Sequence, residues 1–194
     1  MAERDESPRL ADGSATGLWQ DVVREAEARA GRTLDESLES YLVFTLLRHQ
    51  RDEQLGHRIM ALDWLQTLER SARWREHGLR DVGDRCLLLA GLYPEQASRR
   101  RVGLDYFVDI GRSAYDDLAS ALRVGLADLF SELARAFTEL VRVLLEIRKL
   151  SGQWNGLEPL QSLALCTERG QIKPELAQRS FPGAIVIGGS ERVQ

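Results

Sequence analysis

Leu126-Ala-Asp-Leu-Phe-Ser-Glu-Leu-Ala-Arg-Ala-Phe-Thr-Glu-Leu-Val-Arg-Val-Leu-Leu-Glu-Ile-Arg-Lys-Leu150 is the stretch that decides the fold class of this chain. Its apolar residues step alternately by four and three positions, and charged residues occupy the opposite side. That spacing is typical of an amphipathic helix, and the width of the apolar stripe favours packing in a bundle over a narrow coiled-coil seam. The stretch therefore predicts one long amphipathic helix over about 126–150, with the other helices around it.

The rest of the chain also reads as helix. The five prolines stand at 8, 94, 159, 174 and 182, which leaves two long stretches free of proline. Apolar residues recur there at helical spacing. The expected helices are 18–30, 34–46, 55–71, 79–90, 103–123 and 156–168. The fold class is therefore predicted as all-α, a single-domain bundle of six or seven helices.

Glycines and a capping motif set several of the expected boundaries. Thr33-Leu-Asp-Glu36 has the spacing of a capping box, which predicts a helix start. Gly31 stands where a helix commonly ends. Gly83 and Gly111 lie inside expected helices at a cost of about 1 kcal/mol each, so we expect close helix crossings there. Gly125 is expected to mark a break.

A chain of 194 residues is most simply one domain. Residues 1–15 are charged or small and are expected to form a disordered N-terminal segment. Residues 16–169 form the expected helical domain, and 170–194 an irregular tail rich in turn signals. The apolar stretch 181–187 in that tail is expected to dock, either on its own bundle or on a second subunit.

Composition excludes several classes of protein. Lys plus Arg total 26 and Asp plus Glu total 30, so the net charge is −4, which argues against a dedicated nucleic-acid binder. Cys86 and Cys166 form no paired-cysteine motif. The charged N-terminus is not a secretory signal, and no apolar run approaches the roughly 20 residues of a membrane span. We expect a cytoplasmic protein with no membrane contact.

Asp84 begins the group of polar residues that is the candidate ligand site. It follows Gly83 on an otherwise apolar helix, where a carboxylate is costly to bury unless it is paired. Arg112, Arg80 or a tyrosine hydroxyl could satisfy it. The simpler interpretation is a structural hydrogen-bond network between two helices. The functional alternative is a small polar pocket for a ligand, formed by Asp84, Asp105, Tyr106, Asp109, Arg112 and Tyr115.

Other groups of residues give weaker indications of a functional site. His49, Glu53 and His57 share a helical spacing but lack an apolar shield, so we predict no metal site. Gly111-Arg-Ser113 lacks the second glycine of a nucleophile elbow, and no phosphate-binding loop is present. We therefore predict no catalytic residue and no cofactor. Residues Arg70–Arg101 carry eight arginines against four acids, so either a solvated face or a nucleic-acid interface could lie there.

One region resembles a known family. The residues on which this resemblance rests are Leu79-Arg80, Gly83-Asp84, Leu87, Gly91-Leu92-Tyr93 and Glu95, followed by Asp105-Tyr106-Phe107, Gly111, Ala114-Tyr115 and Leu118. This spacing, over about residues 79–118, resembles the central signature of an uncharacterised family of bacterial all-helical proteins. The resemblance implies a bacterial source and a helical fold, and it implies no activity, cofactor or site residue.

The sequence favours a non-enzymatic helical interaction protein, an adaptor or regulator that associates with itself and with an unknown protein partner. The alternative is a ligand-binding or enzymatic bundle with a polar pocket near Asp84, Asp105 and Tyr115, because helical enzymes can assemble sites without a readable motif. A third hypothesis is nucleic-acid binding through Arg70–Arg101.

Overall fold

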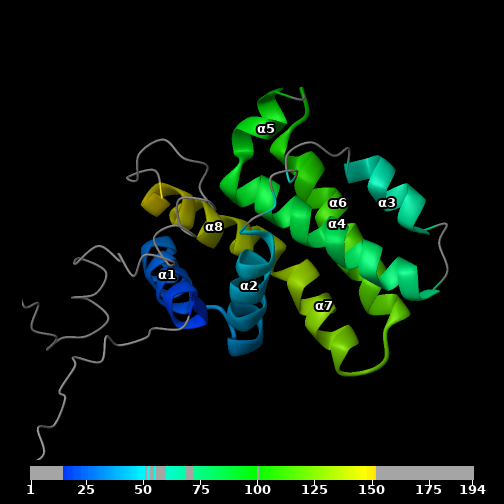
Figure 1. The fold of residues 1–194 in the computed structure, drawn as a ribbon, viewed down its shortest axis with the longest axis horizontal. Helices are drawn as coiled ribbons and strands as arrows, with labels where there is room; N and C mark the ends of the chain where they lie inside the picture. Colours follow the sequence, from blue (N-terminus) through cyan, green and yellow to red (C-terminus); the bar gives the residue numbers. More distant parts are fainter. Residues whose placement is uncertain are drawn as a thin grey trace, which may run out of the picture.

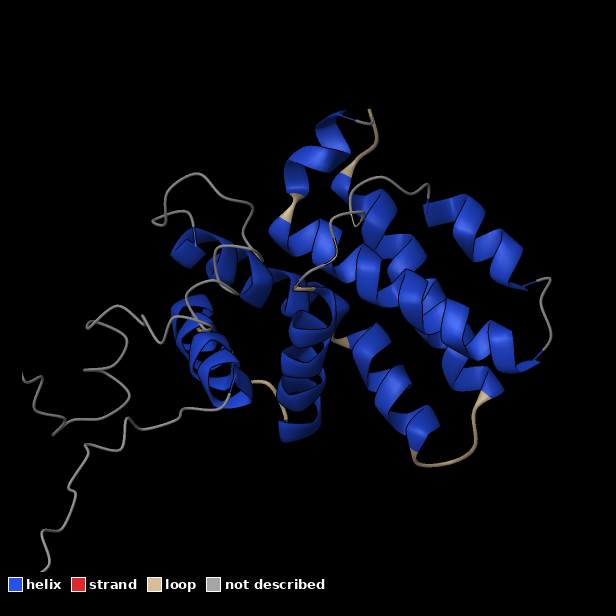
Figure 2. Cartoon of the chain, viewed as in Figure 1, coloured by secondary structure: helices blue, strands red, loops and turns tan. Residues whose placement is uncertain are grey.

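The computed structural model describes residues 15–50, 52, 55, 60–68, 72–99 and 101–151. Every regular element in these ranges is a helix (Figure 2). In chain order the helices are α1 (Ala15–Ala30), α2 (Glu36–His49), α3 (Met60–Leu68), α4 (Ala72–Leu92), α5 (Pro94–Arg99), α6 (Leu104–Ala121), α7 (Leu126–Arg135) and α8 (Phe137–Ser151). The predicted all-α, single-domain class is confirmed. The expected helix 156–168, the tail 170–194 and all but the last residue of the expected disordered segment 1–15 lie outside the described residues.

Two differences raise the number of helices in the described part above the expected six or seven. The connection after Tyr93 contains the short helix α5, which begins with Pro94. Proline suits the first helical position because the amide hydrogen that it lacks would have no partner there. The second difference is that the predicted long helix 126–150 is two helices.

The division between α7 and α8 falls at Ala136, whose φ of −83° and ψ of 3° leave the helical region. The amide of Ala136 still donates to the carbonyl of Glu132 at 2.8 Å, so Ala136 is the one residue between the two helices. The helical spacing of the apolar residues therefore continues from α7 into α8. The bend lets Phe130 and Phe137 close on the Tyr115 ring, with centroids 5.8 and 5.9 Å from it. Periodicity cannot reveal a bend that preserves the period.

Helix α4, which lies beside α6, packs more extensively than either α7 or α8, the two helices of the expected central stretch at 126–150 (Figure 1). It packs along α6 and also against α3, α5 and α8. The reason lies in the stretch from Cys86 to Leu92, which is apolar on all sides and buried throughout. A helix that is apolar all round belongs in the interior.

Glycines allow the closest approaches to α4, as expected. A Cβ on Gly83 would overlap the Tyr115 ring of α6, and one on Gly111 of α6 would overlap the Cβ of Cys86 as well as the ring of Phe137. Gly91 lies equally close to Leu144 of α8. The close packing compensates for the low helix propensity of glycine. Gly125, with φ of +101°, precedes α7 and confirms the expected break.

The start of α2 differs from the predicted capping box. The helix begins at Glu36, and its N-cap is Asp35, which makes no side-chain cap bond. The buried Glu27 carboxylate of α1 instead accepts a 2.6 Å bond from the Leu34 amide. This bond holds the connection on α1, so α2 starts later than Thr33. Gly31 ends α1 with φ of +61°, as expected. Among the described residues, no helix has the length and apolar character that a membrane span needs.

Substituting Gly91→Ala should destabilise the bundle by about 1–3 kcal/mol, because the added methyl group overlaps Leu144. Intrinsic helix propensity alone would predict stabilisation by about 1 kcal/mol. Urea unfolding followed by circular dichroism distinguishes the two. Ser120→Ala on the exposed side of α6 is the control, and an equal effect of both substitutions would contradict the close crossing.

Glu27 supplies a pH test. Burial raises the pKa of its carboxyl group, against the opposing effect of the Leu34 amide. A raised folded-state pKa in an acid means that its contribution to stability falls as pH rises through the interval above the ordinary value of 4.5. Glu27→Gln keeps an oxygen acceptor for Leu34 and removes the charge. The free energy of unfolding of the variant, relative to that of the parent, should therefore increase as the pH rises above the ordinary carboxyl value of 4.5. A relative increase as the pH falls would contradict the burial effect.

Candidate functional site

Asp84 is the centre of the polar interior. Its side chain is fully buried on α4. Oδ1 accepts the hydroxyl of Tyr41 at 2.6 Å and the hydroxyl of Tyr115 at 2.8 Å, and Oδ2 accepts Nη1 of Arg48 at 2.7 Å. These donors come from α2 and α6, so one carboxylate joins three helices. Bonds to a charged acceptor are about twice as strong as neutral ones.

A second guanidinium completes this group. Nε of Arg80 lies 3.8 Å from Oδ2 of Asp84 and donates to the Tyr41 hydroxyl at 3.2 Å. The guanidinium carbon of Arg80 also lies 5.1 Å from the centroid of the Tyr41 ring, within range of a cation–π interaction. We call Tyr41, Arg48, Arg80, Asp84 and Tyr115 the Asp84 network.

His49 connects the network to further charges. Its Nε2 lies 3.9 Å from Oδ2 of Asp84, and its Nδ1 lies 3.4 Å from Oδ2 of Asp52. Arg85 in turn contacts Asp52 and Asp81, each at 2.9 Å. Charged and polar side chains therefore continue from the buried carboxylate to the surface between α2 and α4.

The two tyrosines act as permanent donors. Burial raises the pKa of Tyr41 and of Tyr115, and the nearby charge of Asp84 raises both further. Both hydroxyls therefore stay protonated at physiological pH and hold the carboxylate in place. Because Asp84 is enclosed by side chains of its own chain, it is poorly placed to take a proton from a substrate or to attack one.

The residues of the sequence-predicted ligand pocket separate into two places. Asp84 and Tyr115 are in contact, and Arg80 and a tyrosine hydroxyl satisfy the carboxylate as the sequence suggested. Arg112, the other suggested partner, has an exposed side chain. Asp105 and Asp109 are also exposed, and Tyr106 is half-buried with its ring against Phe107. The structure thus brings together two of the six predicted residues.

Sequence reasoning missed the contribution of α2. Tyr41, Thr45, Arg48 and His49 lie at positions i, i+4, i+7 and i+8, so they share one face of that helix. Within the expected helix 34–46, Tyr41 and Thr45 stand at the helical spacing of Leu34, Leu38 and Leu42, so the sequence alone places them on its apolar side. Two basic residues at the end of that side were the available signal that a buried acid lies opposite.

An apolar hollow of about 270 Å³ adjoins the Asp84 network. Its apolar wall comes from the end of α6 and the start of α7, and consists of Leu118, Leu122, Leu126, Leu129 and Phe130. Its polar side consists of Tyr41 from α2 and of Glu76, His77 and Arg80 from α4. Tyr41 and Arg80 therefore belong both to the network and to the hollow.

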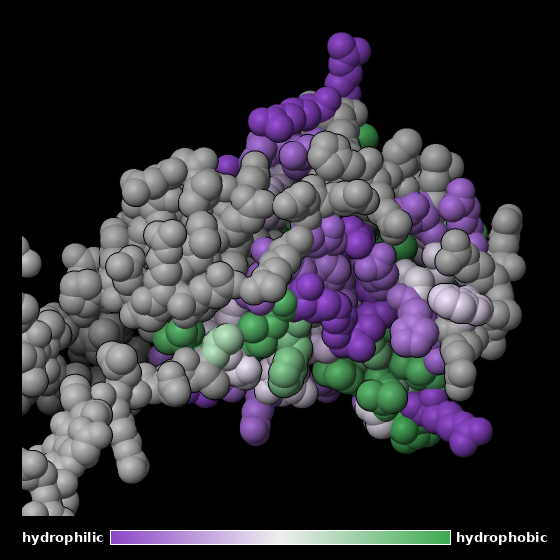
Figure 3. All heavy atoms as spheres, viewed as in Figure 1, coloured by the Kyte–Doolittle hydropathy of each residue, from purple (hydrophilic) through white to green (hydrophobic). Residues whose placement is uncertain are grey.

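Exposed apolar side chains gather at the same end of the bundle. Val124 and Leu126, in and after the α6–α7 turn, are 94% and 60% exposed, and Trp74 of α4 is 64% exposed. The pairing of Gly83 with Tyr115 and of Gly111 with Cys86 sets α4 antiparallel to α6, which brings the first turn of α4 beside that turn. Apolar side chains collect there on the surface (Figure 3). We call Trp74, Val124, Leu126 and the hollow the apolar end.

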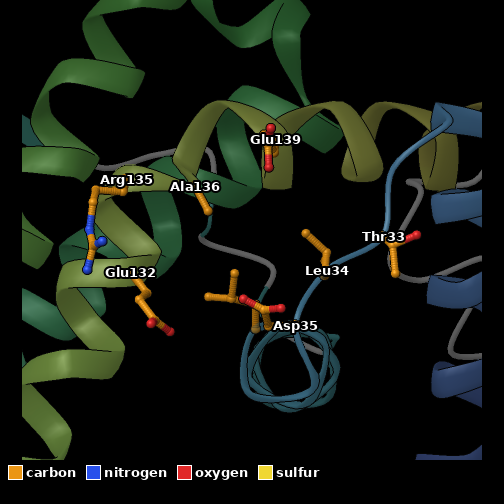
Figure 4. Close-up of a pocket in the computed structure, with 8 residues that line it drawn as sticks. Thr33, Leu34, Asp35, Glu132, Arg135, Ala136 and Glu139 are labelled. Atoms are coloured by element: carbon orange, nitrogen blue, oxygen red, sulfur yellow. The ribbon is translucent and has the colours of Figure 1, made fainter.

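A second hollow, of about 330 Å³, differs in chemistry. It lies where the connection around Asp35 faces the α7–α8 junction (Figure 4). Carboxylates of Asp35, Glu132 and Glu139 line it, and Arg32 lies 3.7 Å from Glu139. No group of three metal-ligating side chains with the geometry to hold an ion occurs in the described ranges. The lining of this crevice is mainly charged, in contrast to that of the apolar hollow.

The arginine-rich segment is partly used inside the fold. Arg80 and Arg85 pair with acids, and Nη2 of Arg75 donates to the carbonyl of Leu68 at 2.7 Å. Arg99 and Arg101 are exposed. Arg70, Arg100 and the side chain of Arg73 lie outside the described residues, as do Glu53 and His57 of the histidine constellation.

Asp84→Asn should destabilise the protein by about 3–5 kcal/mol, because it removes the negative charge that faces Arg48 and Arg80 and replaces one of the two acceptor oxygens with a donor. Tyr115→Phe should cost less, about 1–3 kcal/mol, since it removes one donor. Asp109→Asn, on the exposed side of α6, is the matched control and should change little. Chemical unfolding of the purified variants measures all three, and an Asp84→Asn variant as stable as the control would contradict a structural role for the network.

Comparison of the chain with protein-family models, with curated proteins and with solved structures finds no match. The resemblance of residues 79–118 to a bacterial helical family therefore stays a prediction. What the protein does has to be inferred from its own side chains.

Proposed function

We propose that the protein is a non-enzymatic interaction protein, an adaptor or regulator of the bacterial cytoplasm, that binds through its apolar end. One observation carries the proposal: Trp74, Val124 and Leu126 expose large apolar side chains around a hollow whose wall is apolar. Scattered apolar residues are normal on a protein surface, whereas a group around a concavity is typical of binding sites.

The Asp84 network supports a role that is not catalytic. The buried carboxylate is engaged by donors from α2 and α6, and both phenols are held in their neutral form. Such a network fixes the positions of three helices. It thereby makes the hollow beside it a rigid surface, which lowers the cost of ordering when a partner binds.

A second copy of the chain is the partner that the apolar end suits best. The same surface carries a protruding side chain, Val124, and a concave wall beside it. In an interface between two identical copies related by a two-fold axis, each surface must be complementary to itself. A protrusion and a hollow on one face meet that requirement.

A ligand-binding role is the second candidate, because a charged side chain, Arg80, lines an otherwise apolar concavity. The nucleic-acid hypothesis receives less support. Arg85 is engaged with Asp52 and Asp81, and Arg75 with the carbonyl of Leu68, which reduces the charge that the segment could offer to phosphates.

Native mass spectrometry and light scattering of the full chain test the proposal. We expect an oligomer, whose mass is an integer multiple of the 21.9 kDa of one chain. Leu126→Asp should convert that species to a monomer, because a carboxylate in an apolar contact is costly to desolvate.

Phe44→Asp on α2 is the matched control, because Phe44 is 55% exposed and lies outside the apolar end. This variant should keep the parent mass. A parent that is monomeric at every concentration, or a control that dissociates as readily as Leu126→Asp, would count against the apolar end as the contact.

A further inference from the structure

We propose that the apolar hollow is a binding site for a small amphipathic monocarboxylate, whose apolar part lies on α6 and α7 and whose carboxylate is held by Arg80. The inference goes beyond self-association, since one copy of the chain carries every residue of the site.

Arg80 is equipped to hold an anion. Within the described part of the chain, its polar contacts to Tyr41 and Asp84 run through Nε. Those contacts fix the side chain while the two terminal nitrogens, Nη1 and Nη2, keep their donors for another acceptor. A guanidinium presents such donors as a planar fork, which matches the two oxygens of a carboxylate.

The surroundings favour an anion that carries an apolar group. Leu122, Leu129 and Phe130 belong to the wall, so a purely polar anion would leave their side chains against water. The volume of about 270 Å³ suits a small molecule, because pockets for drug-sized ligands begin near about 300 Å³. A short alkyl or aromatic acid therefore fits both the size and the polarity of the hollow.

Glu76 is the opposing charge in the site. It precedes Arg80 by one helical turn and also lines the hollow, so it repels an incoming carboxylate. The exposed His77 lies beside it. The arrangement predicts opposite effects on the affinity for a carboxylate. Removing the charge of Arg80 should weaken binding, and removing the charge of Glu76 should strengthen it.

Isothermal titration of the full chain with sodium octanoate tests the proposal, with octylammonium chloride as the probe of reversed charge. The protein concentration is kept where the native mass spectrum shows a monomer, so that a second copy does not compete. We expect saturable binding of one octanoate per chain and weaker binding of octylammonium by at least tenfold. Equal binding of the two probes, or no binding of octanoate at millimolar concentration, would overturn the proposal.

Variants assign the carboxylate to Arg80. Arg80→Gln should weaken octanoate binding by tenfold or more, and Arg112→Gln, which removes an exposed arginine elsewhere on α6, should leave it unchanged. Because Arg80 belongs to the Asp84 network, this substitution also removes contacts that stabilise the fold. Glu76→Gln avoids that difficulty and should strengthen binding severalfold; unchanged or weaker binding in Glu76→Gln would overturn the assignment.

The two proposals fail separately. A chain that binds octanoate and stays monomeric at all concentrations contradicts self-association and leaves the carboxylate site standing. A chain that forms dimers through Leu126 and ignores octanoate when monomeric contradicts the carboxylate site alone.

Discussion

The structure depends on one buried charge. Asp84 is fully buried on α4, beside the apolar stretch from Cys86 to Leu92, where an unpaired carboxylate would be several kcal/mol too costly to keep. Its two oxygens can be satisfied only when Tyr41 and Arg48 of α2 and Tyr115 of α6 lie in fixed positions relative to α4. The carboxylate thus acts less as a source of stability than as a constraint on which arrangement of these helices is acceptable.

Packing around the network follows from that constraint. The Tyr115 ring must lie close enough for its hydroxyl to reach Asp84, and the absence of a side chain on Gly83 gives it that room. Phe130 and Phe137 then close the other sides of the ring, which is possible because the chain bends at Ala136. The end of α6 and the start of α7 then line the apolar hollow together with Tyr41 and Arg80. The position of the proposed binding surface is a by-product of satisfying the buried acid.

Local patterns predicted the class of fold well and the centre of the fold poorly. Helical periodicity, Gly31 and Gly125 located most helices and breaks, because these features depend on neighbours along the chain. The bend at Ala136 escaped because it preserves the period. Asp84 was recognised as needing a partner, and Arg80 and a tyrosine were among the suggested ones. Arg48 could not be identified, because a donor on another helix is chosen by the tertiary arrangement and leaves only a faint trace in the sequence.

The spans of the network bonds bear on how the chain folds. The bonds from Asp84 to Tyr41, Arg48 and Tyr115 join residues that are 43, 36 and 31 positions apart. Helices form early from local contacts, whereas such distant pairs form only after the entropic cost of closing long loops has been overcome. A partly assembled bundle in which Asp84 has lost water but has gained only one partner would be high in energy. The acid therefore links the docking of α2 and α6 on α4 into a single cooperative event, which disfavours half-formed states with exposed apolar surface.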